Sequence, residues 1–186
     1  LDYSGSCPAL LLEPQRTNGA HYSEYFDSYY DADVNFDNIT ITHNAIISPD
    51  GLQNAAKLAG NNTSKDPANA YIGRNTLVAS QPYVSSVFAK AGEYDYAVVT
   101  IGSYASGFWA SFNLDTGVVD TQPTAGNTTA SIEDYGDGWY RCIIHTTNSA
   151  GGEGIFFTPS VDGTLSTNYT NTTNGVYFWG VQVESG

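Results

Sequence analysis

Aromatic and polar side chains in the stretch 94–113 are suited to binding a sugar. Within residues 107–113, apolar side chains at even positions alternate with Trp109, Ser111 and Asn113 at odd positions. If the even positions of a strand face the core, Trp109 faces outward, where its flat ring could stack on the C–H face of a sugar. The alternative for Trp109 is packing beneath a loop. The polar and aromatic neighbours that we expect from adjacent segments are Tyr71, Arg74 and Tyr104.

Catalytic motifs are missing from the sequence. No segment has the spacing of a hydrolase nucleophile elbow, a phosphate-binding loop or a dinucleotide fingerprint. The three histidines, His21, His43 and His145, lie too far apart to place two metal ligands on one element. The glutamates form no Glu-x-Asp-x-x-Glu cluster, which would put the acid and the nucleophile of a glycosidase on one strand. The sequence therefore favours binding over catalysis and leaves a polysaccharide-degrading enzyme as the third hypothesis.

The charge balance argues against nucleic acids and anionic membranes as partners. Six basic residues stand against 19 acidic ones, which gives a formal net charge of −13. Phosphate backbones are bound by Lys and Arg, so this charge has the wrong sign. Only 13% of the residues are charged, and the abundant Ser, Thr, Asn and Gly must supply much of the polar surface. Such a surface suits a virion or extracellular protein.

The length and composition indicate one folded domain over residues 1–186. Hydrophobic residues make up 41% of the chain and aromatic residues 13%, which is enough apolar surface for a core. No stretch approaches the roughly 20 apolar residues of a membrane span. The chain contains no Met and both its ends are abrupt, so we expect it to be a segment of a longer polypeptide.

Turn signals and period-2 alternation recur along the chain, and they predict an all-β protein. Turn residues such as Ser48-Pro49-Asp50-Gly51 and Gly136-Asp137-Gly138 separate short runs of β-branched and aromatic residues. Helical propensity is credible only at residues 53–58, and that run is too short to form a stable helix alone in water. The pattern favours a two-sheet antiparallel β-sandwich of jelly-roll type. The predicted strands are 9–12, 34–42, 71–75, 84–89, 94–102, 107–113, 129–134, 139–147, 154–158 and 175–183.

Bulky side chains occupy both faces of the predicted strand 139–147, with Trp139 on one face and Tyr140 on the other. A strand with two bulky faces is expected in the centre of a sheet. We therefore expect Trp139 to be core, not a platform for a ligand. The last predicted strand alternates in the same way, and we expect Phe178 or Trp179 to be core as well.

The only cysteines are Cys7 and Cys142. A disulfide between them would close a loop of roughly 135 residues and stabilise the fold by about 4 to 5 kcal/mol on the chain-entropy model. The alternative is two separate buried thiols, each packing as a small hydrophobic side chain. The sequence leaves both arrangements open.

Four segments together match the pattern of a known group of domains. They are residues 6–18 (SCPALLLEPQRTN), 48–51 (SPDG) leading to 55–58 (AAKL), 138–142 (GWYRC) and 179–186 (WGVQVESG). With them the chain resembles the carbohydrate-binding-module-like, concanavalin-A-like sandwich domains of bacteriophage tail fibres and other virion structural proteins. The resemblance implies a non-catalytic module that recognises a polysaccharide or a cell-surface glycan. The main alternative is a structural spacer or assembly domain that contacts neighbouring domains or subunits of a fibre, which could be homotrimeric.

The same resemblance implies a structural calcium ion, which jelly-roll binding modules commonly hold between their chain ends. Glu13 on the first predicted strand and Glu184 on the last could share this ion. The acidic loop 27–37 is another source of oxygen ligands. Its alternative is a solvated loop without a metal.

Asn-x-Ser/Thr sequons are frequent in this chain. In a secreted eukaryotic protein several could carry glycans. In a phage protein they would be chance products of a sequence rich in Asn and Thr, and we prefer this interpretation. The sequons begin at Asn38, Asn61, Asn62, Asn127, Asn168 and Asn171.

Overall fold

The fold is described from a computed structural model. The structure describes residues 18, 20, 23, 24, 26, 35–60, 69–72, 80–102, 108–122, 127–147, 154–165, 169 and 171–185, with only the backbone at 35–37 and 69–72. The predicted strand 9–12 lies outside the described residues. So do Glu13, Arg74 and Tyr104.

The described residues form twelve β-strands and no helix, and so contain no helix that could cross a lipid bilayer. The strands are β1 (Asn35–Asp37), β2 (Ile39–Ile46), β3 (Ala55–Gly60), β4 (Asn69–Ile72), β5 (Tyr83–Ala91), β6 (Tyr96–Ile101), β7 (Trp109–Asn113), β8 (Val118–Thr121), β9 (Thr129–Asp134), β10 (Trp139–Thr146), β11 (Ile155–Ser160) and β12 (Gly175–Ser185).

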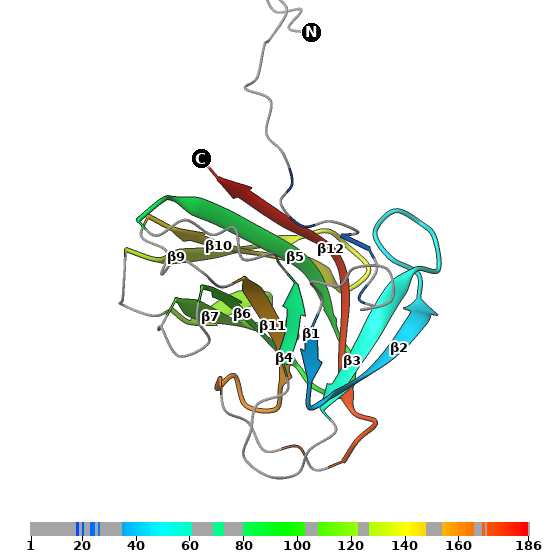
Figure 1. Ribbon diagram of the computed structural model, residues 1–186. Helices are drawn as coiled ribbons and strands as arrows, with labels where there is room; N and C mark the ends of the chain where they lie inside the picture. Colours follow the sequence, from blue (N-terminus) through cyan, green and yellow to red (C-terminus); the bar gives the residue numbers. More distant parts are fainter. Residues whose placement is uncertain are drawn as a thin grey trace, which may run out of the picture.

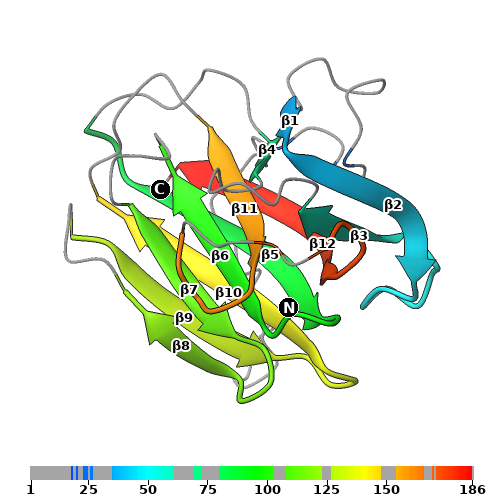
Figure 2. The same ribbon diagram turned by 90° about the horizontal axis from the view of Figure 1, so that it is seen from below.

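Two antiparallel sheets face each other as two layers (Figure 1). The β6 sheet has the strand order β1-β4-β11-β6-β7-β8, and the β5 sheet has the order β2-β3-β12-β5-β10-β9. Successive strands pass repeatedly from one sheet to the other, and Figure 2 shows the two layers from below. The predicted two-sheet antiparallel sandwich of jelly-roll type is therefore confirmed.

Alternation along the strands builds the core between the sheets. On β5, Val87 and Ala89 point inward, and on β7, Ala110 and Phe112 do so, all at 0–1% exposure. Phe157 of β11 contacts Phe178 of β12 across the two layers, with ring centroids 5.3 Å apart. Each fully buried Val or Phe side chain contributes about 1.5 to 3 kcal/mol through removal of its surface from water, and each buried Ala methyl group contributes less.

Despite the helical propensity of residues 53–58, no helix forms there, and residues 55–58 belong to the strand β3. Its neighbours β2 and β12 both pair with it, and Ala56 and Leu58 enter the core. The helical propensity of a few Ala and Leu residues is a weak preference that pairing on both sides overrides. The strand β8 was not predicted at all.

A single residue divides the predicted strand 34–42 into two. Asn38 has a positive φ of 54°, and the chain turns there from β1 in the β6 sheet to β2 in the β5 sheet. Asn tolerates this left-handed conformation better than most residues. The predicted bounds of β9 agree with the structure, and the other described predicted strands agree to within a few residues at each end.

Residues near the two ends of the chain lie side by side. The amide Nδ2 of Asn18 donates to the carbonyl of Val181 at 3.1 Å, and its Oδ1 accepts from the backbone N–H of Val183 at 3.0 Å. The backbone N–H of Val181 also donates to the carbonyl of Ser23 at 3.0 Å. Because β3 pairs with β12 only as far as Phe178, these early residues occupy the edge of β12 that β3 leaves open.

Candidate functional site

A hollow of about 350 Å³ opens on the outer face of the β5 sheet, between two turns. One turn connects β2 to β3 and the other connects β9 to β10; they are the cyan and yellow connections that lie beside each other in Figure 1. We call this site the Tyr135 hollow. Its lining residues are Ile47, Ser48, Pro49, Gly51, Lys90, Tyr135, Gly136, Asp137 and Trp139.

Local hydrogen bonds fix the first turn. The carbonyl of Ser48 accepts from the N–H of Gly51 at 3.0 Å, and Gly51 has the positive φ of 87° that this tight turn requires. The Asp50 carboxylate accepts from the Ser48 hydroxyl and from the backbone N–H of Leu52, and these bonds lower the pKa of Asp50. Asp50 therefore stays ionised beside the hollow at neutral pH.

The second turn is equally constrained. The backbone N–H of Tyr135 donates to the carbonyl of Trp139, and the N–H of Trp139 donates to the carbonyl of Gly136, both at 2.9 Å. Asp134 accepts from the N–H of Gly136 through its side chain at 2.8 Å. Positive φ values at Gly136, Asp137 and Gly138 explain the Gly-Asp-Gly sequence, because these residues adopt that conformation at least cost.

Trp139 forms the floor of the hollow. It is 3% exposed, and its indole Nε1 donates to the carbonyl of Ile47 at 3.2 Å. Trp139 is buried, as predicted, but it is not part of the hydrophobic cluster between the two sheets. On β10 the core face holds Cys142 and Ile144, so Trp139 lies on the opposite face and is buried beneath the first turn.

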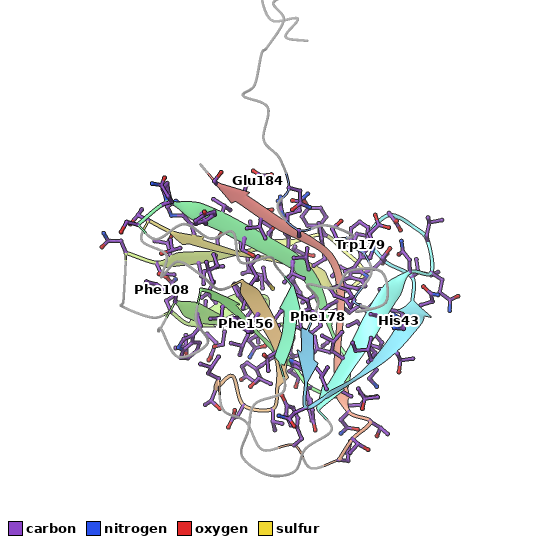
Figure 3. The ribbon with its side chains drawn as sticks, in the orientation of Figure 1. His43, Phe108, Phe156, Phe178, Trp179 and Glu184 are labelled. Carbon is purple, nitrogen blue, oxygen red and sulfur yellow. The ribbon has the colours of Figure 1, made fainter. Side chains whose placement is uncertain are left out.

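Tyr135 forms an aromatic wall of the hollow. Half of its surface is exposed (51%), and its ring meets that of Phe88 edge to face at a centroid distance of 4.8 Å. Phe88 in turn contacts Trp179 at 5.4 Å. The sequence predicts that Phe178 or Trp179 is a core residue. Figure 3 shows Phe178 between the sheets and Trp179 on the outer side of β12, so Phe178 is the core residue. The packing against Phe88 orients Tyr135 while leaving it accessible.

Lys90 and Asp137 provide the charged groups of the hollow. The Lys90 Nζ donates to the backbone carbonyl of Asp137 at 2.5 Å. Among the described residues, no carboxylate lies within 4.0 Å of this ammonium group. Asp137 is exposed, and in the described part of the chain its carboxylate accepts no hydrogen bond. The wall of the hollow therefore has a hydrogen-bond donor in Lys90 and an acceptor in Asp137.

The other two basic side chains in the described residues lie on the same outer face but are already paired. Lys57 forms an ion pair with Glu93 at 2.7 Å, and the pKa of Glu93 is lowered, chiefly by this hydrogen bond from Lys57 and also by one from the backbone N–H of Gly175. Arg141 donates to Gln182 at 3.0 Å and to Ser86. Lys90 is thus the described cation best placed to contact a ligand.

Two of the sugar-binding residues predicted from the sequence, Tyr71 and Trp109, lie on the β6 sheet. Trp109 is half-buried on the outer face of β7, and the expected alternation is confirmed because Ala110 and Phe112 are in the core. Tyr71 on β4, Phe156 on β11, Thr100 on β6 and Trp109 are paired in one row across the β6 sheet. Three strand spacings separate Tyr71 from Trp109, or roughly 14 Å. Whether these residues bind a sugar stays a prediction, and Arg74 and Tyr104 lie outside the described residues.

The calcium prediction also stays a prediction. Glu184 is partly buried near the end of β12 (Figure 3), whereas Glu13 and most of the loop 27–37 lie outside the described residues. Within the part of the chain that the structure describes, no three His, Cys, Asp or Glu side chains are grouped as metal ligands.

Cys142 is a free thiol, fully buried in the core, and burial raises the pKa of this thiol far above its usual range. For Cys142 the structure therefore has the buried thiol and not the disulfide. Cys7 lies outside the described residues.

Backbone conformation accounts for the Asn at three of the sequons. Asn38 and Asn127 have positive φ values of 54° and 51°. The Oδ1 of Asn171 accepts from the backbone N–H groups of Thr173 and Asn174 at 3.0 and 2.8 Å, which closes an Asx turn. These roles supply a structural reason for Asn at each site that does not involve a glycan.

In comparisons with known proteins, no model of a protein family matches this sequence, and no curated protein is significantly similar to it.

Proposed function

We propose that this chain is a non-catalytic module that binds a polysaccharide or cell-surface glycan, as part of a phage tail fibre or another surface-exposed fibre. The observation that carries the proposal is the Tyr135 hollow, in which a half-exposed aromatic ring stands beside an ammonium group and a carboxylate. Sugar-binding sites combine these elements, because the ring faces of a sugar are apolar and its hydroxyls need donors and acceptors.

The size and rim of the hollow support this proposal. Its volume of about 350 Å³ falls at the lower end of the range for small-molecule sites, which suits one or two sugar units. Ile47 and Leu52, at 61% and 63% exposure, add apolar surface at the first turn. Large side chains this exposed, next to a hollow, are typical of a contact surface.

The carboxyl groups at the hollow support binding more than hydrolysis. Glycosidases use two carboxyl groups on opposite sides of the scissile bond. Among the described residues, Asp137 is the acidic residue that lines the hollow, and Asp50 lies beside it on the first turn. A single lining carboxylate can hold a sugar hydroxyl group, which supports a binding role.

A glycan array probed with the purified chain tests the proposal, followed by calorimetric titration of the best ligand. We expect saturable binding to a subset of glycans and no release of reducing sugar. An array without any bound glycan would overturn the proposal and favour the structural spacer domain of a virion or filament. Release of reducing sugar would favour the enzyme.

A further inference from the structure

We infer that the Tyr135 hollow selects uncharged sugar units and rejects units that carry a carboxylate. This inference rests on the proposed function and names the class of glycan. It depends on how the charged groups are arranged in the wall of the hollow.

The first argument is hydrogen-bonding capacity. An ammonium group has three donors, and Lys90 uses one of them on the carbonyl of Asp137. The Asp137 carboxylate only accepts. A sugar hydroxyl both donates and accepts, so two neighbouring hydroxyls can accept from Lys90 and donate to Asp137 at the same time. A neutral sugar unit therefore satisfies both groups.

An acidic unit that places its carboxylate at Lys90 cannot satisfy both groups, because a carboxylate has no proton to donate to Asp137. Its carboxylate could accept from Lys90, but the contact between Lys90 and the carbonyl of Asp137 holds the two residues together. Asp137 lines the same hollow, so a carboxylate bound to Lys90 would enter a hollow whose wall already carries a negative charge, and like charges repel. The attraction to Lys90 is offset by this repulsion.

The surrounding field acts in the same direction. Asp50 lies on the first turn, between lining residues Pro49 and Gly51, and Asp134 precedes the second turn. The whole chain has a net charge of −13. A polyanion approaching the hollow is repelled over about one Debye length, roughly 8 Å at physiological salt. A neutral polysaccharide meets no such barrier.

The test uses pairs of polymers with the same sugar and the same linkage that differ only in oxidation at C6: β-1,4-mannan with poly-β-1,4-mannuronate, and β-1,4-glucan with poly-β-1,4-glucuronate. Affinity of the purified chain for each is measured at low salt and at physiological salt. We expect the neutral member of the preferred pair to bind at least tenfold more tightly at low salt. Added salt should narrow this ratio by improving acidic binding, because it screens the repulsion without affecting neutral binding.

Asp137→Asn is the decisive variant, since Asn also adopts a positive φ and should preserve the turn. We expect this variant to bind the acidic polymer about tenfold more tightly than the wild type does. The ratio of its affinities for the neutral and the acidic polymer should therefore become smaller. Asp115→Asn, at an exposed turn position outside the hollow, is the matched control and should leave the ratio unchanged.

Equal or tighter binding of the acidic polymer to the wild-type chain would overturn this inference and leave the proposed function intact. An unchanged ratio in Asp137→Asn would also overturn it, because the selectivity would then have another source. If no neutral or acidic glycan binds in the array or in the polymer series, both the inference and the proposed function are overturned.

Discussion

The indole Nε1 of Trp139 donates a hydrogen bond to the backbone carbonyl of Ile47 at 3.2 Å, across 92 positions of sequence. This contact joins the turn after β2 to the turn before β10. The other hydrogen bonds described for the two turns lie mostly within each turn, so the bond between Trp139 and Ile47 helps to fix the distance between the two walls of the hollow. Trp139 is thus a positioning residue for the proposed site.

Trp139→Ala should destabilise the fold by about 3 to 5 kcal/mol, because it removes a buried aromatic side chain and the hydrogen bond to Ile47. The free energy of unfolding can be measured by urea denaturation. Trp109→Ala is the matched control, since Trp109 is half-buried, and we expect a smaller loss there. An equal loss in the two variants would contradict the role assigned to Trp139.

Tyr135→Ala should abolish glycan binding and lower the free energy of unfolding by less than about 1 kcal/mol, because half of the side chain is already in solvent. Calorimetric titration and urea denaturation measure the two effects. Trp109→Ala serves here as the rival variant. Loss of binding in Trp109→Ala with normal binding in Tyr135→Ala would move the site to the β6 sheet.

The pair of Lys57 and Glu93 should make stability depend on acid pH. The pKa of Glu93 is lowered in the folded chain from an ordinary value of 4.5, so its contribution is complete above that value and is lost as the pH falls through the lowered pKa. Melting temperatures between pH 7 and pH 3 should therefore fall less steeply in Glu93→Gln than in the wild type. The same acid dependence in both proteins would exclude this pair as a cause.

Cys142 should resist modification in the folded state, because its thiol is fully buried and its pKa is raised. A Cys7→Ser background leaves Cys142 as the one cysteine. We expect a thiol reagent to react with it slowly in buffer and rapidly in urea. Equal rates in the two solvents would contradict the burial of Cys142.

Calcium removal tests the metal prediction. A site bound only in the folded state stabilises by mass action, so chelator should lower the melting temperature by several degrees. Glu184→Gln should remove most of that shift if Glu184 is a ligand. A melting temperature that chelator leaves unchanged in the wild type would exclude a stabilising calcium ion.

The sequence predicts the sandwich well, because alternation and turn residues are local signals. Residues 129–134 and 139–147 illustrate this, since each has a clear period of two and a turn between them. The sequence fails at residues 53–58, where an Ala-rich strand has no alternation to distinguish it from a helix. The break between β1 and β2 is also not predicted, because it depends on the positive φ of a single residue, Asn38, at which the chain passes from one sheet to the other.

The candidate site was less predictable than the fold. Both turns that border the hollow are evident from Ser48-Pro49-Asp50-Gly51 and Gly136-Asp137-Gly138. Their proximity follows from strand order and register, which place Lys90 opposite Trp139 and bring the first turn over both. Pairings between residues this far apart in sequence leave no local pattern.

The hydrogen bonds between the Asn18 side chain and β12 would have a mechanical consequence if the module is one of several domains in a fibre. Tension that enters near residue 18 and leaves through the end of β12 would be borne first by the hydrogen bonds that join Asn18 and Ser23 to Val181 and Val183. β5 pairs with Gln182–Ser185 on the other edge of β12 and would share this load. The hollow lies beside Lys90, whose partner on β12 is Tyr177, so the load would enter β12 at the end of the strand away from the hollow.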